Sequence, residues 1–463
     1  MKKLLLLLAA TLVFATGQAQ DAATAWKTLY PQILKNIKAP TFRDKDYNIA
    51  DFGAVPNDTT IVNHASINRA IATCSIEGGG RVIVPKGLWF TGPITMRSNV
   101  NLHLEEGATL LFTTDLKYFP VVLTRWEGVD TYNTSPLIYA YGETNIAVTG
   151  KGTIDGHATR ADWWSQTGPT PAEGRGTQRV SRPIMLKWAE DKVPLAERVM
   201  NNGDGMRVQT INFYLCRNIL IEDVTLLRSP FWVIHPLMCD NLTVRGVRID
   251  NHGPNGDGCD PESCSNVLIE NCYFMTGDDC IAIKSGRNND ARVWNIPSRN
   301  IIVRNCTMAD GHGGVVIGSE IGGGYKNLFV ENCNMDSPNL DRVIRLKTNN
   351  CRGGTIENLF VRNVTVGQCR ESVLHINLRY EPNEACDRSF PPIVRNVWMD
   401  GVTSQKSRYG VWIDAYEQGT NVYDIHVSDC NWNGVAENNF IRGQVDNLTF
   451  DNLKINGQPV KVK

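Results

Sequence analysis

The sequence predicts an all-β protein, a single-domain right-handed parallel β-helix with an N-terminal capping helix. Three observations lead to this fold class. The second half of the chain carries a weak repeat, each repeat has the alternating apolar residues of a strand, and successive repeats begin only 23 to 38 residues apart. Strand units this short cannot bury a core alone, so we expect them to stack with one repeat per coil.

The repeat begins with asparagine and continues as apolar, any, apolar, any, a turn residue, and then Cys or Val. It is enriched in β-branched residues and bounded by turn residues, which is typical of strands. Clear copies begin at Asn218, Asn241, Asn266, Asn300, Asn327, Asn358, Asn396, Asp424 and Asn447, and fainter copies at Asn99 and Asn145. A β-propeller is the alternative architecture, but these units are shorter than a four-stranded blade usually needs.

Two positions of the repeat carry recurring side chains. Asparagine at the first position predicts a ladder at a turn, and Cys or Val at another predicts a stack inside the coil. The chain has 13 cysteines, and this odd number leaves at least one outside any intrachain disulfide. Because several cysteines recur at one place, we expect small core residues rather than a disulfide lattice. The cysteine and histidine spacings indicate no metal site.

The N-terminus has the pattern of a secretory signal peptide. Two lysines precede an apolar run from Leu4 to Ala15, and small residues follow, so cleavage is expected after Ala19. A membrane anchor is the alternative, but the run is too short to span a bilayer comfortably, and no later segment is long and apolar enough. We expect a signal peptide over 1–19, one β-helix domain over 20–463, and export through Sec to the periplasm or the medium.

The first part of the mature chain shows helical patterns. Apolar residues at helical spacing cover 21–38, and a second helix is predicted over 63–74, after a strand-like segment. Such a helix would cap the open end of the β-helix and block edge pairing. Residues 158–207 are rich in Gly, Pro and charge, and we interpret them as a long insertion loop that forms a wall of a cleft.

The charge balance argues against a nucleic-acid partner. The formal net charge is −1, and the chain contains no basic tract. Near-neutrality does not exclude an anionic substrate, because local cations can bind it.

Chemistry-bearing side chains recur at similar offsets from the repeat asparagines. They lie 12 to 20 residues after the asparagine that opens their coil, near the second strand or turn of four successive coils. Adjacent coils stack about 4.8 Å apart, as strands do, so the register predicts one polar stripe on an outer face. Its members are Asp257, Asp278, Asp279, His312, Arg345 and Lys347. The alternative is a stripe of solvated turn residues, because Asp and Gly are common in turns.

These residue types suit the hydrolysis of an acidic sugar polymer. A glycosidic bond needs one protonated carboxylic acid for the leaving oxygen, and one carboxylate that activates water or attacks directly. Crowding of three aspartates raises the pKa of one of them and keeps it protonated near neutral pH. His312 can tune that acid through a hydrogen bond. Arg345 and Lys347 alternate on a strand, so both can face the groove and hold a sugar carboxylate.

The motifs that contain these residues occur in a recognisable order. They are Asn255-Gly256-Asp257, Gly277-Asp278-Asp279, Gly311-His312-Gly313 and Arg345-Leu346-Lys347, supported by Asp51-Phe52-Gly53-Ala54 and Ser229-Pro230-Phe231-Trp232. In this order they resemble glycoside hydrolase family 28, the polygalacturonases and their relatives. The resemblance covers essentially the whole mature chain, and the four motifs together are much more specific than any one of them.

The resemblance implies a right-handed parallel β-helix and an inverting hydrolase that needs no cofactor or metal. Asp278 is then the general acid, and Asp257 with Asp279 positions the attacking water. His312 assists the reaction.

The resemblance also implies substrate-binding residues. Arg345 and Lys347 bind the galacturonate carboxylate, Asn255 orients the neighbouring carboxylates, and Tyr380 in the next coil is similar to a subsite tyrosine of the family. One departure is Gly256, where polygalacturonases often have Thr. It leaves the acids intact but puts plain homogalacturonan as the substrate in doubt.

Two stretches resemble the bacterial exo-acting branch of the family. They are Arg125-Trp126-Glu127-Gly128 and the run from Asp257 through Asp260 to Ser263. Such enzymes have extra loops that close one end of the cleft, and the 158–207 insertion is a candidate for such a loop. Within it, Trp163 and Trp164 either stack on sugar rings or anchor the loop. We therefore expect release of terminal galacturonate rather than cleavage within the chain.

Other functions stay open. The nearest alternative is a hydrolase of rhamnogalacturonan or another branched pectin. Pectate lyases also use parallel β-helices, but they depend on calcium held by carboxylates and on an Arg base, so chelators would abolish activity. A non-catalytic sugar-binding β-helix protein would show no turnover. We expect a monomer whose partner is a pectic poly- or oligosaccharide, with no nucleic acid, cofactor or membrane anchor.

Overall fold

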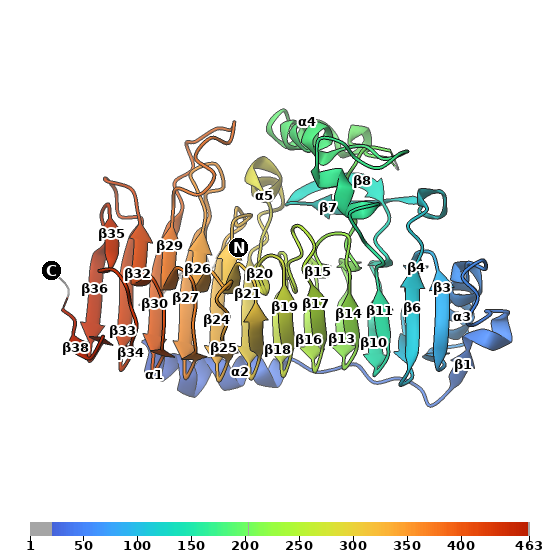
Figure 1. The fold of residues 1–463 in the computed structure, drawn as a ribbon, viewed down its shortest axis with the longest axis horizontal. Helices are drawn as coiled ribbons and strands as arrows, with labels where there is room; N and C mark the ends of the chain where they lie inside the picture. The colour runs from blue at the N-terminus through green and yellow to red at the C-terminus, as the bar shows by residue number, and fades with distance from the viewer. Residues whose placement is uncertain (1–20, 202, 462–463) are drawn as a thin grey trace, which may run out of the picture.

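The chain winds into a long parallel β-helix whose coils stack along one axis (Figure 1). This computed structural model describes residues 21–201 and 203–461, and the predicted signal peptide lies outside them. Three sheets run the length of the molecule, and strands of successive coils pair in parallel. The predicted fold class, a right-handed parallel β-helix, is confirmed. In the described part of the chain, no helix is long and apolar enough to cross a membrane.

Each coil contributes strands to three sheets. The first sheet contains β1 (Asp46–Asn48), β2 (Gly80–Val84), β5 (Val100–Leu104), β10 (Thr144–Gly150), β13 (Arg217–Glu222), β16 (Asp240–Arg245), β18 (Ser265–Glu270), β21 (Ser298–Arg304), β24 (Tyr325–Glu331), β27 (Thr355–Arg362), β30 (Ile393–Asp400), β33 (Val422–Ser428) and β36 (Asp446–Asp451). The second sheet contains β3 (Gly87–Thr91), β6 (Ala108–Phe112), β11 (Thr153–Asp155), β14 (Thr225–Leu227), β17 (Arg248–Asn251), β19 (Tyr273–Thr276), β22 (Thr307–Asp310), β25 (Asn334–Met335), β28 (Thr365–Val366), β31 (Thr403–Ser404), β34 (Asn431–Trp432), β37 (Lys454–Ile455) and β38 (Gln458–Pro459).

The third sheet falls into two runs. One run contains β4 (Ile94–Thr95), β9 (Ile138–Tyr141), β12 (Ile211–Tyr214) and β15 (Ile234–Leu237), and the other contains β20 (Ile281–Ile283), β23 (Gly313–Gly318), β26 (Arg342–Lys347), β29 (Ser372–Asn377), β32 (Tyr409–Asp414) and β35 (Phe440–Arg442). A short segment joins the runs, because Cys259 bridges to Ile234 on one side and to Ile281 on the other. The loop that carries Asp257 therefore enters the middle of this sheet.

The repeat asparagines form the predicted ladder. Each lies in the first sheet with a left-handed backbone, as Asn327 does with φ 66°. Asn327 Nδ2 donates to Asn300 Oδ1 at 2.9 Å, and Asn358 Nδ2 donates to Asn327 Oδ1 at 2.8 Å. Asparagine suits this position because its short polar side chain stabilises a left-handed backbone by local hydrogen bonds.

Replacing Asn327 by Ala is expected to lower the free energy of unfolding by about 2–4 kcal/mol. The change removes two ladder hydrogen bonds and leaves a Cβ-bearing residue in the left-handed region. Asn327→Gly removes the same bonds without the backbone strain, so we expect it to cost about half as much. Urea unfolding of the three proteins measures both effects. Equal losses in the two variants would remove the strain argument, and no loss in either would remove the ladder's contribution.

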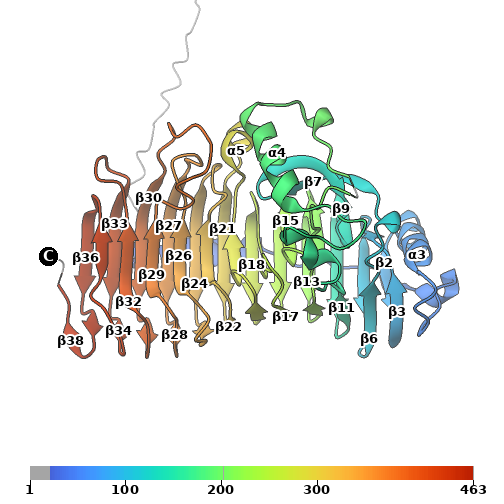
Figure 2. The ribbon, with the colours of Figure 1, turned by 45° about the horizontal axis from the view of Figure 1, so that its top comes forward.

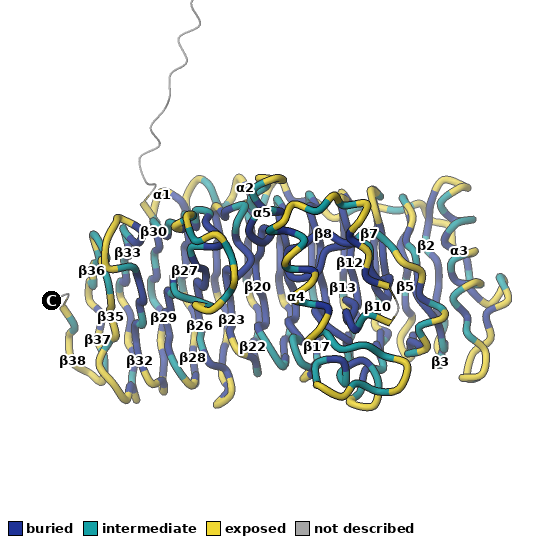
Figure 3. The backbone as a smooth tube through the Cα atoms, turned by 90° about the horizontal axis from the view of Figure 1, so that it is seen from above, coloured by how far each residue is buried: buried dark blue, intermediate teal, exposed yellow. Residues whose placement is uncertain are grey.

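The Cys and Val positions of the repeat form the predicted inward stack. Cys272, Cys306 and Cys333 follow one another there, each at most 2 % exposed, and the buried interior continues along the coils (Figure 3). Eleven described cysteines are free and buried, whereas Cys351 and Cys386 form a disulfide. The cysteines therefore serve mainly as small core residues, as the repeat indicated.

The helices lie outside the coils. They are α1 (Ala22–Thr24), η1 (Ala25–Leu29), α2 (Tyr30–Asn36), η2 (Ile49–Phe52), α3 (His64–Ile76), η3 (Leu116–Tyr118), η4 (Trp163–Thr167), α4 (Gln178–Glu190), η5 (Leu195–Glu197) and α5 (Asn288–Trp294). Helix α3 covers the first end of the β-helix, where Ile67 and Ile71 join the main core, which confirms the predicted cap (Figure 1). Helix α2 instead runs along the outer face of the first sheet and packs Ile33 near Phe329.

Residues 158–207, predicted as an insertion loop, contain η4, α4 and η5 and stand above the third sheet (Figure 2). Helix α4 buries Met185 and Ala189, but Pro183 lies inside it and obscures its pattern in the sequence. Beside it stands an antiparallel hairpin of β7 (Val121–Trp126) and β8 (Val129–Thr134). We call this hairpin, α4 and residues 381–385 together the roof.

A buried charge network fixes the hairpin to the third sheet. Arg125 Nε donates to Asp130 Oδ1 at 2.8 Å, and Arg125 Nη1 donates to Glu262 Oε1 at 2.9 Å. His235 Nε2 lies 2.9 Å from the other oxygen of Glu262. Burial raises the pKa of Glu262, but the charges of Arg125 and His235 outweigh it and lower the pKa. Since breaking a buried pair is costly, this network holds the hairpin turn at a fixed height above the sheet.

Candidate active site

The candidate site lies where four successive coils enter the third sheet. Asp257 follows β17, the Asp278-Asp279 pair lies between β19 and β20, and His312 lies between β22 and β23. The bridge from Cys259 to Ile281 places the residues two positions earlier, Asp257 and Asp279, at the same level on adjacent coils. The structure thus brings together the carboxylates that the sequence placed on one stripe.

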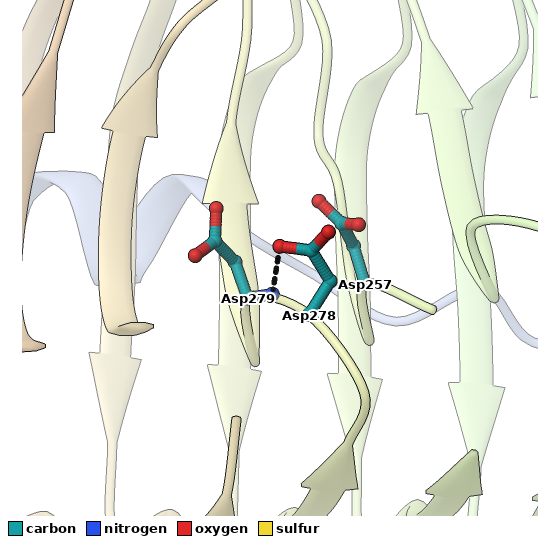
Figure 4. Close-up of side chains that lie close together, drawn as sticks. All are labelled: Asp257, Asp278 and Asp279. Atoms are coloured by element: carbon teal, nitrogen blue, oxygen red, sulfur yellow. Dashed lines mark hydrogen bonds between the residues drawn. The ribbon is translucent and has the colours of Figure 1, made fainter. Parts of the chain in front are cut away.

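The three aspartates form one cluster (Figure 4). One oxygen of each carboxylate lies within 4.8 Å of one oxygen of each of the others. The Asp279 backbone N–H donates to Asp278 Oδ1 at 3.0 Å, which fixes the two neighbours relative to each other. The side chain of Asp278 is 21 % exposed, whereas that of Asp279 is fully buried. Asp278 is therefore the carboxylate that solvent or a substrate reaches most readily.

The two predicted cations, both on β26, contact the buried carboxylate directly. Lys347 Nζ donates to Asp279 Oδ2 at 2.7 Å, and Arg345 Nη1 lies 3.7 Å from Asp279 Oδ1. Asp279 Oδ1 is buried and has no hydrogen-bond partner among the described residues. The ring of Tyr380 lies 5.3 Å from Lys347 Nζ and 5.5 Å from the Arg345 guanidinium. The stripe thus ends in two cations beside an aromatic ring.

His312 lies beside the most exposed acid. Its Nδ1 is 3.1 Å from Asp278 Oδ1, and this hydrogen bond raises the pKa of His312 above its usual value. Burial alone raises the pKa of Asp278, but the hydrogen bond to His312 and the charge of Lys347 outweigh it and lower the pKa to about 2. Asp278 and His312 therefore form a partly exposed ion pair.

The pKa of Asp257 shifts in the opposite direction to that of Asp278. Its burial raises its pKa well above the ordinary value, and the charge of Asp278 adds to this effect. Burial likewise raises the pKa of Asp260, neither of whose carboxyl oxygens has a hydrogen-bond partner in the described part of the chain. The surroundings of the cluster therefore favour the protonated forms of Asp257 and Asp260 beside an ionised Asp278.

Sequence reasoning missed Lys284, which follows β20. Its Nζ lies 3.7 Å from Asp257 Oδ2, 3.3 Å from Glu320 Oε2 and 4.3 Å from the centre of the Trp232 ring. Burial lowers the pKa of Lys284, but the charges of Glu320, Asp260 and Asp257 outweigh it and raise the pKa. One signal was available, since Lys284 ends an otherwise apolar strand and must therefore find a carboxylate.

Asn255 lines the site, but its side chain bonds to a cation. Its Oδ1 accepts a hydrogen bond from Arg207 Nη2 at 2.6 Å. Arg207 is fully buried, and burial lowers its pKa to about 9.

The departure at Gly256 has a steric cause in this loop. A Cβ there would lie 2.6 Å from Asn251 Nδ2 and 2.6 Å from the Gly253 oxygen, so Thr does not fit.

A cavity of about 340 Å³ lies over the cluster and is closed by the roof. Its lining combines the candidate site with residues from distant segments. They are Glu127, Gln178, Arg182, Trp232, Asn255, Asp257, Asp278, Lys284, Ser319, Glu320, Lys347, Tyr380 and Glu381. Trp163 and Trp164 are not among them. Trp163 is buried against Phe119, and Trp164 Nε1 donates to the Ser229 oxygen at 2.9 Å, so both anchor the insertion.

Comparisons with known proteins give the family. A family model described as glycosyl hydrolases family 28 matches residues 196–443. The crystal structure of a hyperthermoactive exopolygalacturonase from Thermotoga maritima is 39 % identical, with a TM-score of 0.88, over 94 % of this chain and 97 % of that one. The chain therefore belongs to glycoside hydrolase family 28, and it is a glycoside hydrolase.

Two curated relatives extend the comparison. A probable polygalacturonase of Vitis vinifera is 30 % identical over 331 residues, which is 69 % of this chain and 60 % of that relative's length. An exo-poly-α-D-galacturonosidase of Dickeya chrysanthemi is 27 % identical over 451 residues, which is 90 % of this chain and 73 % of that relative.

Proposed function

We propose that this protein hydrolyses α-1,4-galacturonosyl linkages in pectic poly- or oligosaccharides and releases galacturonate from chain ends. The observation that carries the proposal is the cluster of three carboxylates, within 4.8 Å of one another, beside a cavity that Asp257, Asp278 and Lys347 line and that lies under a roof. The names of the Thermotoga and Dickeya relatives support the substrate and the exo mode.

Asp278 acts as the general acid toward the leaving oxygen. It is the most exposed carboxylate of the cluster, and a general acid must reach the proton acceptor. Its pKa of about 2 is lower than that of an acid that keeps its own proton near neutral pH. The catalytic proton therefore resides on His312, which passes it to Asp278 along their 3.1 Å hydrogen bond as the leaving oxygen gains charge.

Asp279 and Asp257 position the attacking water. Two oxygens up to 4.8 Å apart can both accept from one water at normal hydrogen-bond lengths of about 2.7 Å. An oxygen of Asp279 becomes one acceptor when substrate binding uncovers it, and Asp257 is the other once it releases its proton.

This arrangement predicts inversion, although the three carboxylates lie closer together than the roughly 6.5–9.5 Å typical of two-carboxylate inverting enzymes. Proton NMR of the first-formed product distinguishes the outcomes. The β-anomer supports water held by the pair, and the α-anomer would mean that one carboxylate attacks directly.

Arg345, Lys347 and Tyr380 hold the sugar next to the cluster. The Arg345 side chain is 10 % exposed, and its guanidinium suits a carboxylate. The ring of Tyr380 offers a flat apolar surface beside both cations. A galacturonate residue meets both needs because it has an apolar ring face and a carboxylate.

The site is expected to work outside the cytoplasm as a monomer, after removal of residues 1–19 as a Sec signal peptide. N-terminal sequencing of the exported protein tests the cleavage after Ala19, and light scattering tests the oligomeric state. An intact Met1 or a stable oligomer would contradict this part of the proposal.

The test of the proposed function is product analysis on polygalacturonate. Galacturonate as the first and sole small product supports the proposal. A mixture of oligomers would mean an endo-acting enzyme. Products from rhamnogalacturonan alone would move the substrate to a branched pectin. Unsaturated, chelator-sensitive products would indicate a lyase, and no product from any pectin would leave only sugar binding.

Substitution of His312 by Ala is expected to move the alkaline limb of the pH profile to lower pH. In the wild type, the His312–Asp278 pair loses its proton only as pH rises through the raised pKa of His312. Without His312, the proton must stay on Asp278 itself, so the limb shifts by at least about 2.6 pH units, the usual difference between the pKa values of His and Asp. Profiles of kcat/KM on trigalacturonate measure the shift. An unchanged alkaline limb would exclude His312 as the holder of the proton.

A further inference from the structure

One arginine of the insertion closes the upper end of the catalytic cavity. Arg182 of α4 donates from Nε to Glu127 Oε2 at 2.7 Å, and its Nη2 lies 3.7 Å from Glu381 Oε1. Glu127 lies in the turn of the β7–β8 hairpin, and Glu381 follows β29. The three parts of the roof, which are far apart in the sequence, therefore meet at this one side chain.

Other arginines also hold both carboxylates that Arg182 contacts. Arg287 Nη1 lies 3.2 Å from Glu127 Oε2 and its Nη2 lies 3.0 Å from Glu381 Oε2, while Arg352 Nη2 lies 2.7 Å from the same Glu381 oxygen. The Cys351–Cys386 disulfide further fixes residues 381–385. Loss of Arg182 would therefore open the roof without releasing either glutamate.

A second and larger cavity lies on the other side of this contact. It measures about 630 Å³, and both cavities have Arg182 and Glu381 among their lining residues. The outer cavity has an apolar wall of Pro183, Leu186 and Pro382. Glu190, Asp191 and Glu384 also line it, and Lys187 at its edge is paired with Asp191 at 2.7 Å. The apolar wall suits the ring face of a sugar, whereas the acidic part of the lining would weaken the binding of a sugar carboxylate.

We infer that Arg182 is the residue that limits the released product to one sugar, and that the outer cavity is the space into which a longer chain would extend without it. This inference rests on the proposed function, because it concerns which end of a galacturonide chain fits the cavity. With Arg182 in place, a sugar over the cluster must be terminal. Without Arg182, the galacturonide chain can continue past Glu127 into the outer cavity. The bond over the carboxylate cluster is then the second from the chain end, so digalacturonate is released.

The experiment compares wild type and Arg182→Ala on polygalacturonate, with products separated by anion-exchange chromatography at the first time points. We expect the initial ratio of digalacturonate to galacturonate to rise by about tenfold or more in Arg182→Ala. Glu381→Gln, which keeps the Arg182–Glu127 pair, is expected to give a smaller rise in the same direction. The matched control is Arg179→Ala, an exposed arginine one turn earlier in α4, which should keep the wild-type ratio.

The double variant Arg182→Ala/Leu186→Ser tests the outer cavity itself. If a second sugar packs its ring on the apolar wall, loss of the Leu186 side chain should lower digalacturonate release again. Exclusive galacturonate release by Arg182→Ala and by Glu381→Gln, both with wild-type melting temperatures, would overturn the inference while leaving the proposed function intact. Wild type that releases no uronic acid from any pectin would instead overturn the proposed function, and the inference with it.

Discussion

Replacement of Asp278 by Asn is expected to lower kcat for galacturonate release by roughly 10²–10⁴-fold, the usual contribution of a general acid. The amide has nearly the same shape as the carboxyl group, but it cannot pass a proton from His312 to the leaving oxygen. Because the acid acts mainly in the transition state, KM should change little. Steady-state kinetics on trigalacturonate at several pH values measure both parameters.

Asp250→Asn is the matched control for this prediction. Asp250 lies on the preceding coil, in β17, and its nearest charged partner is His252 at 3.6 Å. This substitution should leave kcat within about twofold, since it removes a weak surface pair. An Asp278→Asn variant that keeps wild-type kcat and its alkaline limb would show that another group donates the proton, and Asp257 would then be the first candidate because burial keeps it protonated.

The fold could be predicted from the sequence because each coil of a β-helix repeats the same residue pattern. Each coil returns Asn to a left-handed position and Cys or Val to the interior, and both features are local in the chain. Residues at matching offsets therefore had to meet on adjacent coils. For this reason, Asp257, Asp278 and His312 were placed on one face from their spacing alone.

The roof did not follow from the repeat. Glu127, Arg182 and Glu381 come from three segments without a common offset, and only tertiary structure places them in contact. Helix α4 was missed because Pro183 and its charged neighbours hide a short apolar face. Sequence reasoning thus located the wall of the cleft as an insertion, but it did not identify the side chains that form it.

The partners of the two cations, Arg345 and Lys347, could not be predicted from the sequence. The alternation of Arg345 and Lys347 correctly placed both on one face of a strand, and the family resemblance gave them a sugar carboxylate as partner. In the structure, the nearest carboxylate to Lys347 belongs to Asp279 of the protein. A spacing argument fixes which face a side chain occupies, but not which of two anions neutralises it.

Replacement of Lys347 by Met is therefore expected to damage the chemistry as well as binding. The change leaves the fully buried Asp279 without its 2.7 Å partner, which costs about 3–5 kcal/mol of folding stability. Because a carboxylate that positions the water then loses its fixed place, kcat/KM should fall by roughly 10²-fold. Met keeps most of the side-chain length, so the cavity wall should persist. Kinetics on trigalacturonate over a range of pH values measure the loss.

The pH profile separates this role from simple substrate binding. The charge of Lys347 lowers the pKa of both Asp257 and Asp278, so without it these carboxyl groups keep their protons to higher pH. Because Asp257 must be ionised to position water, the acid limb of kcat should move to higher pH in Lys347→Met. Lys326→Met, which removes an exposed lysine paired with Glu357 at 2.9 Å, should move neither limb. If Lys347→Met raises KM alone, with kcat and both limbs unchanged, Lys347 serves only the sugar carboxylate, and its contact with Asp279 has no part in catalysis.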